Sequence, residues 1–206
     1  MPADLTPVRI ADDVIEFQVE TSRQAQTLAR ELRSAEMAED VVAGLDRVAI
    51  RFAPARATQV EAWLAGIRSI SVEDKIDLPV VEIPVQYGGA FGPDLASICA
   101  AMDLSEDAFI ALHAEVEHLV EMIGFTPGFS YISGLPDTFE IPRLGTPRPR
   151  VPAGSIGISA AFTGIYALAG PGGWPLIGRT QETLFDPDAA ESFLLHPGQR
   201  VKFKAV

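Results

Sequence analysis

Cysteine is almost absent from this chain, since Cys99 is the single cysteine among 206 residues. One cysteine excludes a disulfide within the chain and agrees with a reducing compartment. Long apolar runs are also missing, because none approaches the roughly 18 residues that a membrane-spanning helix needs. The start, MPADLTPVRIADD, lacks the basic and then apolar pattern of a signal peptide. We therefore expect a cytoplasmic protein without a membrane partner.

Basic residues are scarce, with 16 lysines and arginines against 28 acidic residues and a formal net charge of -12. So acidic a chain is poorly suited to the phosphates of nucleic acid, and we expect no nucleic-acid partner. Several familiar motifs are missing too: G-x-x-x-x-G-K-[ST], G-x-G-x-x-G and C-x-x-C do not occur. The first of these absences excludes a P-loop, so a nucleotide would have to be held in another way.

The residues from Gly124 to Thr180 stand out against this background. They include 11 of the 17 glycines and 8 of the 16 prolines, with four arginines, no lysine and two acidic residues. The segment therefore has a net charge of +2 (four minus two), and the rest of the chain has -14. The planar fork of arginine suits carboxylate and phosphate, and glycine lets a backbone approach a ligand closely. The segment indicates a rigid surface that binds anions.

The first part of the chain has the pattern of a small α/β domain. Val14–Val19 and Val48–Phe52 have strand composition, and Thr21 is a suitable N-cap for a helix between them. With Val80–Ile83 available as a last strand, the order of elements indicates a ferredoxin-like unit. The polar stretch Ser71–Asp77 is the best candidate for a linker. We therefore expect one domain at residues 1–78 and a second at 79–206.

The second part begins with helical patterns and then changes to β patterns. Ser105 is expected to cap a long helix whose apolar residues, from Phe109 to Ile123, recur at spacings of 3, 4, 3 and 4. Gly124 is well placed to end that helix. Short apolar pieces separated by glycine or proline follow, which is typical of a β-barrel or a compact sandwich. The sequence as a whole predicts an α+β fold.

Two groups of polar side chains are candidates for chemistry. His113, Glu117 and Glu121 would share one face of the long helix, where ligands at i and i+4 can begin a metal site. No further ligands are visible, so a solvated face is favoured and no metal is expected. His113 borders the apolar stripe, where a histidine is either a satisfied core group or an acid–base group in a cleft; its position favours the first. Arg148 and Arg150 would point to the same side of a strand and need an anion, a carboxylate or open water.

Several longer motifs carry a resemblance to a known family. IPVQYGG and FGPDL occur within residues 83–95, and GFTPGF follows at residues 124–129. TPRPRVPAGS, TGIY, PGGW and IGRT continue in order at residues 146–155, 163–166, 171–174 and 177–180. Over residues 82–187 the chain resembles the family of B-type subunits of the bacterial ATP-dependent 5-oxoprolinase. That family includes proteins labelled allophanate hydrolase subunit 1 and the sporulation-kinase inhibitor of bacilli.

The resemblance implies a small α/β domain followed by a cyclophilin-like β-barrel. It implies a homologous partner, the C-type subunit, and a third subunit with which the family opens the lactam of 5-oxoproline to glutamate. ATP drives that reaction in the complex. Because this chain has no P-loop, the resemblance does not assign the ATP site to it.

The resemblance also implies a set of site residues. Activating a lactam with phosphate places negative charge on the amide oxygen, which fixed guanidinium groups and backbone amides stabilise. The expected catalytic residues are His113 as an acid–base or orienting group, Arg143 and Arg148 on the anion, and Tyr166 as a hydroxyl donor. The expected substrate-binding residues are Arg150, Thr163, Gly172, Gly173 and Arg179.

Two other functions stay open. A carboxyltransferase subunit of the allophanate hydrolase or urea carboxylase type would act on a carboxylated urea-like substrate, together with a biotin-dependent partner. A non-catalytic inhibitor of a sensor histidine kinase would need an exposed apolar patch. Phe162 and Ala167 replace a glutamine and a proline that the family usually has around Thr-Gly-Ile-Tyr. This departure makes that wall of the predicted pocket apolar.

Overall fold

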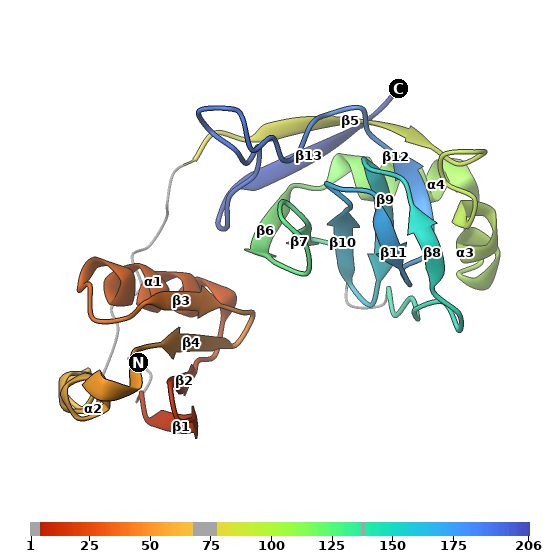
Figure 1. The fold of residues 1–206 in the computed structure, drawn as a ribbon. Helices are drawn as coiled ribbons and strands as arrows, with labels where there is room; N and C mark the ends of the chain where they lie inside the picture. The colour runs from red at the N-terminus through yellow and green to blue at the C-terminus, as the bar shows by residue number, and fades with distance from the viewer. Residues whose placement is uncertain (1–4, 68–77, 137–138) are drawn as a thin grey trace. The chain divides into compact units, whose positions relative to one another are not determined.

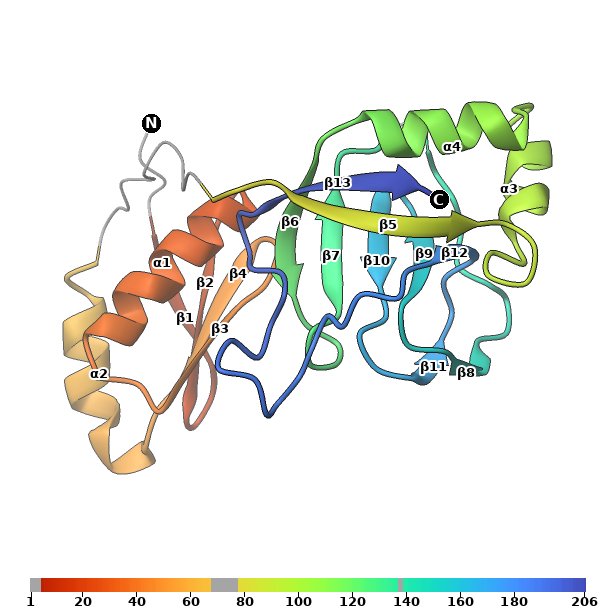
Figure 2. The same cartoon turned by 90° about the horizontal axis from the view of Figure 1, so that it is seen from above.

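The computed structural model describes residues 5–67, 78–136 and 139–206. The chain divides into two compact units, Met1–Ile76 and Asp77–Val206, which Figures 1 and 2 show from two directions. The linker predicted at Ser71–Asp77 lies outside the described residues. Within the described ranges, no helix is long and apolar enough to cross a membrane.

The N-terminal unit is an antiparallel sheet of strand order β1-β2-β4-β3 with helix α1 packed against it (Figure 2). Alternation along two strands turns Phe17 and Ile50 inward, where they share a core with Leu28 of the helix. Thr21 caps that helix as predicted, since its Oγ1 accepts a hydrogen bond from the backbone N–H of Gln24 at 3.2 Å. The elements are β1 (Pro7–Ala11), β2 (Val14–Gln18), α1 (Ser22–Ser34), β3 (Asp40–Ala43), β4 (Arg47–Arg51) and α2 (Ala57–Leu64), the last preceded by a 3₁₀ turn at Pro54–Arg56.

The last strand predicted for this unit, Val80–Ile83, is wrong. Residues 81–83 begin β5 (Val81–Tyr87), which pairs with two strands of the second unit, and Val80 precedes that strand. The edge of the N-terminal sheet is occupied instead by β1, which pairs with β2. Local composition indicates that a segment is extended but does not say which sheet accepts it. The two side chains of β1 that would mark it as a strand, Val8 and Ile10, are both exposed.

The second unit is a closed barrel, which confirms the β-barrel predicted for this part of the chain. Its helices and the mixed N-terminal unit make the whole chain α+β, as predicted. The strand order of the barrel among the described residues is β10-β7-β6-β13-β5-β12-β9. The first and last strands of the unit, β5 and β13, lie side by side and are parallel (Figures 1 and 2). The barrel strands are β5, β6 (His118–Ile123), β7 (Ser130–Ser133), β9 (Ser155–Ser159), β10 (Phe162–Ile165), β12 (Leu176–Arg179) and β13 (Arg200–Ala205); β8 (Arg148–Val151) and β11 (Gly170–Gly172) form a separate ribbon.

Two helices, α3 (Leu95–Ala101) and α4 (Glu106–Glu115), follow β5 and contact each other. Cys99 of α3 is buried in the barrel core. Burial raises the pKa of its thiol, and the nearby Glu106 carboxylate acts in the same direction. The thiol is therefore a packing group rather than a reactive nucleophile.

The long helix predicted through Ile123 is wrong in its second half. Ser105 caps α4 as expected, because its Oγ accepts the N–H of Ala108 at 3.1 Å. The helix ends at Glu115, Val116 is extended, and β6 begins at His118. Glu117 and Glu121 therefore do not share a helix face with His113, and these three residues do not form the i, i+4 ligand pattern of a metal site. Spacings of 3 and 4 between apolar residues fit a helix, but here two of those residues, Leu119 and Ile123, belong to strand β6, where the spacing arises by chance.

Candidate functional site

Arg148, the first residue of β8, is tied to Asp94 at the start of α3. Its Nη2 donates to Oδ1 of Asp94 at 2.8 Å, and both side chains are partly buried, at 29% and 16% exposure. The other carboxylate oxygen, Oδ2, accepts the backbone N–H of Leu176 at 2.6 Å. Of the three surroundings predicted for these arginines, an anion, a carboxylate or open water, Arg148 has a carboxylate from within the chain and Arg150 is exposed to water.

Tyr166 and Arg143 complete what we call the Arg148 site, made of Asp94, Arg143, Arg148, Tyr166 and Gly172. Gly172 is the strand partner of Arg148 and lies against the Tyr166 ring. Burial raises the pKa of Tyr166; a backbone hydrogen bond with Trp174 and the positive charges of Arg143 and Arg148 act in the opposite direction. The phenol is therefore neutral near pH 7 and can donate its proton in a hydrogen bond.

One terminal nitrogen of Arg148 has no hydrogen-bond acceptor among the described residues. This atom, Nη1, is buried in the site. A buried donor without an acceptor costs free energy, commonly about 1–3 kcal/mol. The side chain as a whole is 29% exposed, so other parts of it are accessible although Nη1 is not, and a partly exposed guanidinium is a group that binds anions.

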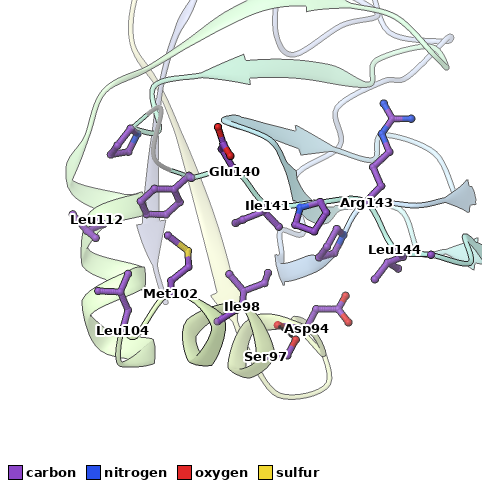
Figure 3. A pocket seen from close by; sticks show the side chains of 16 residues that line it. Asp94, Ser97, Ile98, Met102, Leu104, Leu112, Glu140, Ile141, Arg143 and Leu144 are labelled. Carbon is purple, nitrogen blue, oxygen red and sulfur yellow. Dashed lines mark hydrogen bonds between the residues drawn. The ribbon is translucent and has the colours of Figure 1, made fainter.

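A cavity of about 890 Å³ lies beside this site, between α3, α4, Pro136 and residues 139–145. Its interior is apolar: Ile98, Met102 and Ile141 point toward its middle, whereas Arg143 points away from them at the rim (Figure 3). Asp94 belongs to the wall and also to the Arg148 site. An apolar hollow with charged groups on its border suits a small ligand that has a polar end.

His113 and Thr163 lie together in the interior of the barrel. The Nε2 atom of His113 is 3.0 Å from the hydroxyl oxygen of Thr163, and Nδ1 is 2.6 Å from that of Tyr87. His113 is fully buried and stacks on Phe203, with ring centroids 4.4 Å apart. Both ring nitrogens are satisfied by hydroxyl groups that either donate or accept, so the geometry is that of a neutral core histidine.

The electrostatics of the barrel interior favour neutral histidines. Burial, aided by the neighbouring His118, places the pKa of His113 well below its ordinary value. Burial also lowers the pKa of His118, although the carbonyls of His113 and Ser133, which lie 2.8 Å and 3.2 Å from its Nε2 and Nδ1, act the other way; a neutral ring has one N–H and donates to only one of them. Neither imidazole is a ready acid near neutral pH.

We expect the protein to lose stability as the pH falls below about 6.5, the ordinary pKa of histidine. The unfolded chain takes up protons on His113 and His118 there, while the folded barrel does not, so the free energy of unfolding decreases with falling pH. The limiting slope is about 1.4 kcal/mol per pH unit for each histidine. Urea unfolding at pH 7.5, 6.5 and 5.5 measures it. A free energy that is constant over this range, or that rises as the pH falls, contradicts the assignment.

Gly172 and Gly173, both predicted to offer amides to a substrate, have different surroundings. A Cβ at Gly172 would lie 2.7 Å from Cζ of Tyr166, which is closer than carbon atoms approach in folded proteins. A Cβ at Gly173 would lie 3.7 Å from Pro147, an ordinary contact. The carbonyl of Gly173 accepts the N–H of Leu144 at 2.7 Å. Gly172 is thus required by the packing of the Tyr166 ring.

This difference gives a matched pair of variants. We expect Gly172→Ala to lower the free energy of unfolding by about 1–3 kcal/mol, because the Tyr166 ring must move. Gly173→Ala should change it by less than about 0.5 kcal/mol. Chemical unfolding monitored by tryptophan fluorescence compares the two, since Trp174 contacts the same aromatic cluster. Equal effects from the two variants would show that the contact with Tyr166 is not what excludes a side chain.

The other predicted residues lie elsewhere. Arg179 donates from Nε to the carbonyl of Ala153 at 2.9 Å and lines a second, smaller cavity of about 450 Å³. The predicted set is therefore divided among the Arg148 site, the barrel interior and this second cavity, and Arg150 and Gly173 lie outside all three. Asp94 was not predicted, although it lies in the FGPDL motif. In the described part of the chain, no group of three or more His, Cys, Asp or Glu side chains is placed to hold a metal ion.

Sequence comparison finds a family and close relatives. The family model described as "Carboxyltransferase domain, subdomain C and D" matches residues 8–195. The B-type subunit of 5-oxoprolinase from Escherichia coli O157:H7 is 46% identical over 145 residues, which cover 70% of this chain and 65% of the relative. The B-type subunit of 5-oxoprolinase from Haemophilus influenzae is 38% identical over 191 residues, which cover 90% and 87%.

Structural comparison finds similar folds within longer chains. The crystal structure of TTHA0988 matches with a TM-score of 0.81 and 32% identity, covering 94% of this chain and 40% of that one. The Kluyveromyces lactis urea carboxylase matches with a TM-score of 0.74 at 16% identity, covering 98% of this chain and 22% of that one. At that identity the second match shows a shared fold only.

Proposed function

Since the chain belongs to the carboxyltransferase-domain family of subdomains C and D, as its resemblance to the 5-oxoprolinase family predicted, we propose that it is the B-type subunit of an ATP-dependent 5-oxoprolinase. Relatives that are 38–46% identical carry that name. In this role the chain helps to convert 5-oxoproline to glutamate in the cytoplasm, as part of a complex. We further propose domains at residues 1–78 and 79–206, the first ferredoxin-like and the second cyclophilin-like.

The observation that supports this function is the partly exposed guanidinium of Arg148, which Asp94 holds at 2.8 Å, near a neutral tyrosine. The substrate 5-oxoproline has a carboxylate and a lactam carbonyl, both of which accept hydrogen bonds. Activation of the lactam by a phosphoryl group adds negative charge to its oxygen, and a fixed guanidinium stabilises that charge without reorganisation. We assign the anion to Arg143 and Arg148, and hydroxyl donation to Tyr166.

The remaining site assignments follow as proposals. Thr163 and His113 would act from the barrel interior by holding β10 and α4 in place; an acid–base role for His113 would need an opening of the barrel. Arg150, exposed on β8, and Arg179, in the second cavity, would contact parts of the substrate or of a partner subunit. Gly172 and Gly173 border the anion and would offer backbone amides.

The proposed partners are a homologous C-type subunit and a third subunit. ATP would be bound in the complex and would supply the phosphoryl group that activates the lactam. The chain has no P-loop lysine, and the feature of the described residues that best fits a phosphate is the Arg148 site. This chain would therefore orient and stabilise the anionic substrate rather than bind the nucleotide base.

Phosphate release from ATP by the purified three-subunit complex, with and without 5-oxoproline, tests the proposal. We expect release that requires both 5-oxoproline and this chain. Assembly is checked separately by size-exclusion chromatography. A complex that assembles but shows no release dependent on 5-oxoproline would contradict the oxoprolinase function.

The family description favours one alternative, a carboxyltransferase subunit of the allophanate hydrolase or urea carboxylase type. Phe162, at the start of β10, packs against the aromatic cluster that contains Tyr166 and Trp174. The family usually has a glutamine at this position, so the surface there is apolar in this chain. Activity with a carboxylated urea and a biotin-dependent partner, in place of 5-oxoproline, would identify this alternative. Inhibition of a histidine kinase by the chain alone would identify the non-catalytic one.

A further inference from the structure

We infer that the second cavity, whose lining includes Gln86, Phe91, Gly154 and Arg179, is a binding site for a small carboxylate that also carries an amide group. The class of ligand rests on contacts within the barrel unit, whereas naming the ligand as 5-oxoproline rests on the proposed function. The cavity has a volume of about 450 Å³, within the range of roughly 300–1,000 Å³ that is usual for ligand pockets. Residues of four motifs that are distant in sequence meet there, IPVQYGG, FGPDL, TPRPRVPAGS and IGRT.

Arg179 brings a positive charge with unused donors to this cavity. Its Nε donates to the carbonyl of Ala153 at 2.9 Å, which fixes the plane of the guanidinium. Nη1 and Nη2 make no hydrogen bond or ion pair with any residue that the structure describes. Neither atom is buried, because Nη1 of Arg148 is the one buried side-chain nitrogen or oxygen without a partner in the described ranges. Two accessible N–H groups beside a cavity suit the two oxygens of a carboxylate.

The backbone next to Arg179 is fixed by Gly154. This glycine has a φ of +80°, and a Cβ there would lie 2.1 Å from the carbonyl oxygen of Thr180 and 3.6 Å from Cγ of Arg179. Its N–H donates to the carbonyl of Tyr166 at 2.7 Å, and its own carbonyl accepts the N–H of Thr180 at 2.9 Å. Only glycine fits such a position. A rigid backbone without a side chain therefore keeps space open beside the stem of Arg179.

Gln86 gives the cavity an amide next to that guanidinium. It is the strand partner of Arg179 in the pairing of β5 with β12, so both side chains leave the sheet on the same face, with Cβ atoms about 4.5–5.5 Å apart. The carboxamide of Gln86 makes no hydrogen bond with a described residue, and its polar atoms are not buried. Its oxygen and its NH₂ group can therefore pair with the N–H and C=O of a ligand amide, while Arg179 holds a carboxylate.

The remaining walls fit a small ligand with a flat face. The ring of Phe91 lines the cavity and is 41% exposed, and an aromatic ring beside polar groups can cover a flat amide. Glu182 is the acidic residue of the lining and is exposed. Both Glu182 and Arg179 are described by the structure, and no ion pair joins them. Water and salt screen an exposed carboxylate, so Glu182 opposes an anion only weakly.

Three small ring molecules test which groups the cavity recognises. The first, 5-oxoproline, has a carboxylate and a lactam amide; cyclopentanecarboxylate lacks the amide, and 2-pyrrolidone lacks the carboxylate. By isothermal titration calorimetry on the isolated full chain, we expect 5-oxoproline to bind at least about tenfold more tightly than either of the others, because each of them leaves protein groups unpaired. In two-dimensional NMR spectra, the backbone amides of Gly154 and Thr180 should shift when 5-oxoproline is added.

Variants assign each ligand group to a side chain. Arg179→Gln should raise the Kd of 5-oxoproline at least about tenfold, to within about twofold of the Kd of 2-pyrrolidone. Gln86→Leu should remove the preference for 5-oxoproline over cyclopentanecarboxylate. Glu182→Gln should leave the Kd equal or lower. Arg200→Gln, which changes an exposed arginine of the same unit, is the matched control and should not alter it. If Arg179→Gln does not fold, Arg179→Lys replaces it; lysine keeps the charge without the planar fork, and weaker binding is again expected.

The outcomes distinguish this inference from the proposed function. Equal binding of the three molecules, wild-type affinity in Arg179→Gln, NMR shifts confined to the Arg148 site, or no binding by the wild-type chain would overturn the assignment of the second cavity. Weaker binding by Glu182→Gln would also overturn it, since the ligand would then be a cation. A complex without 5-oxoproline-dependent ATP hydrolysis, but with 5-oxoproline binding that depends on Arg179, would overturn the function and leave the binding site in place.

Discussion

Arg148→Lys is expected to lower kcat/KM for 5-oxoproline-dependent ATP hydrolysis by about 100-fold or more, while the barrel stays folded. Lysine keeps the charge but presents a single ammonium group, which cannot bind Asp94 and a substrate oxygen in the fixed directions of a guanidinium. Losing one or two charge-assisted hydrogen bonds, at about 1.5–3 kcal/mol each, accounts for that factor. Steady-state phosphate release by the assembled complex measures it.

The matched control is Arg200→Lys in the same barrel. Arg200 is 43% exposed, pairs with Glu117 at 3.2 Å, and is not among the residues assigned to the substrate. We expect its kcat/KM to equal that of the wild type. Circular dichroism and the midpoint of thermal unfolding show whether both variants are folded. If Arg148→Lys retained full activity, the anion would have to bind elsewhere, with Arg179 as the next residue to replace.

His113→Ala is expected to lower the free energy of unfolding by about 3–5 kcal/mol. The change removes a fully buried ring that packs on Phe203, and it leaves the hydroxyl groups of Tyr87 and Thr163 without their shared partner. A cavity and two unsatisfied polar groups add to each other in a close-packed core. Equilibrium unfolding in urea measures this loss.

Two further variants decide between a structural and a catalytic His113. His196→Ala removes an exposed histidine and should change stability by less than about 0.5 kcal/mol. His113→Gln keeps hydrogen-bonding capacity, and a folded His113→Gln complex should retain most of its kcat. A folded variant with wild-type stability and no turnover would instead establish the acid–base role implied by the family resemblance.

Local signals in the sequence predicted the local structure well. Thr21 and Ser105 were recognised as N-caps because their side chains satisfy backbone amides within three residues of themselves. Alternation at Val48–Phe52 predicted β4, since one face of that strand is buried. Such features depend on neighbours in the chain, which a sequence displays directly.

Features that depend on distant partners were predicted less well. The end of α4 and the start of β6 were missed because β6 is defined by its pairing with β7 and β13, not by its own pattern. The strand at residues 81–87 was assigned to the wrong sheet for the same reason. A sequence pattern gives periodicity, but it does not identify the partner strand.

The Arg148 site was half predictable. The contrast between a positive, glycine-rich segment and an acidic chain indicated an anion-binding surface, and the family resemblance implied Arg143 and Arg148 as its ligands. The aspartate that holds Arg148 could not be found in this way, because Asp94 lies outside the positive segment, 54 positions before Arg148 in the sequence. The position of His113 beside apolar residues predicted its burial in the core, which is confirmed, whereas the acid–base role that the family resemblance implies stays a prediction.

The pairing of β5 with β13 has a consequence for how the protein is made in the cell. These strands open and finish the second unit, and β13 lies between β5 and β6, so the barrel has a gap until residues 200–205 arrive. A ribosome synthesises the chain from its N-terminus, and the first unit can fold as soon as it emerges. The growing chain must then carry the unpaired edges of β5 and β6 until the last strand leaves the ribosome, a period in which it is open to chaperones and to other nascent chains.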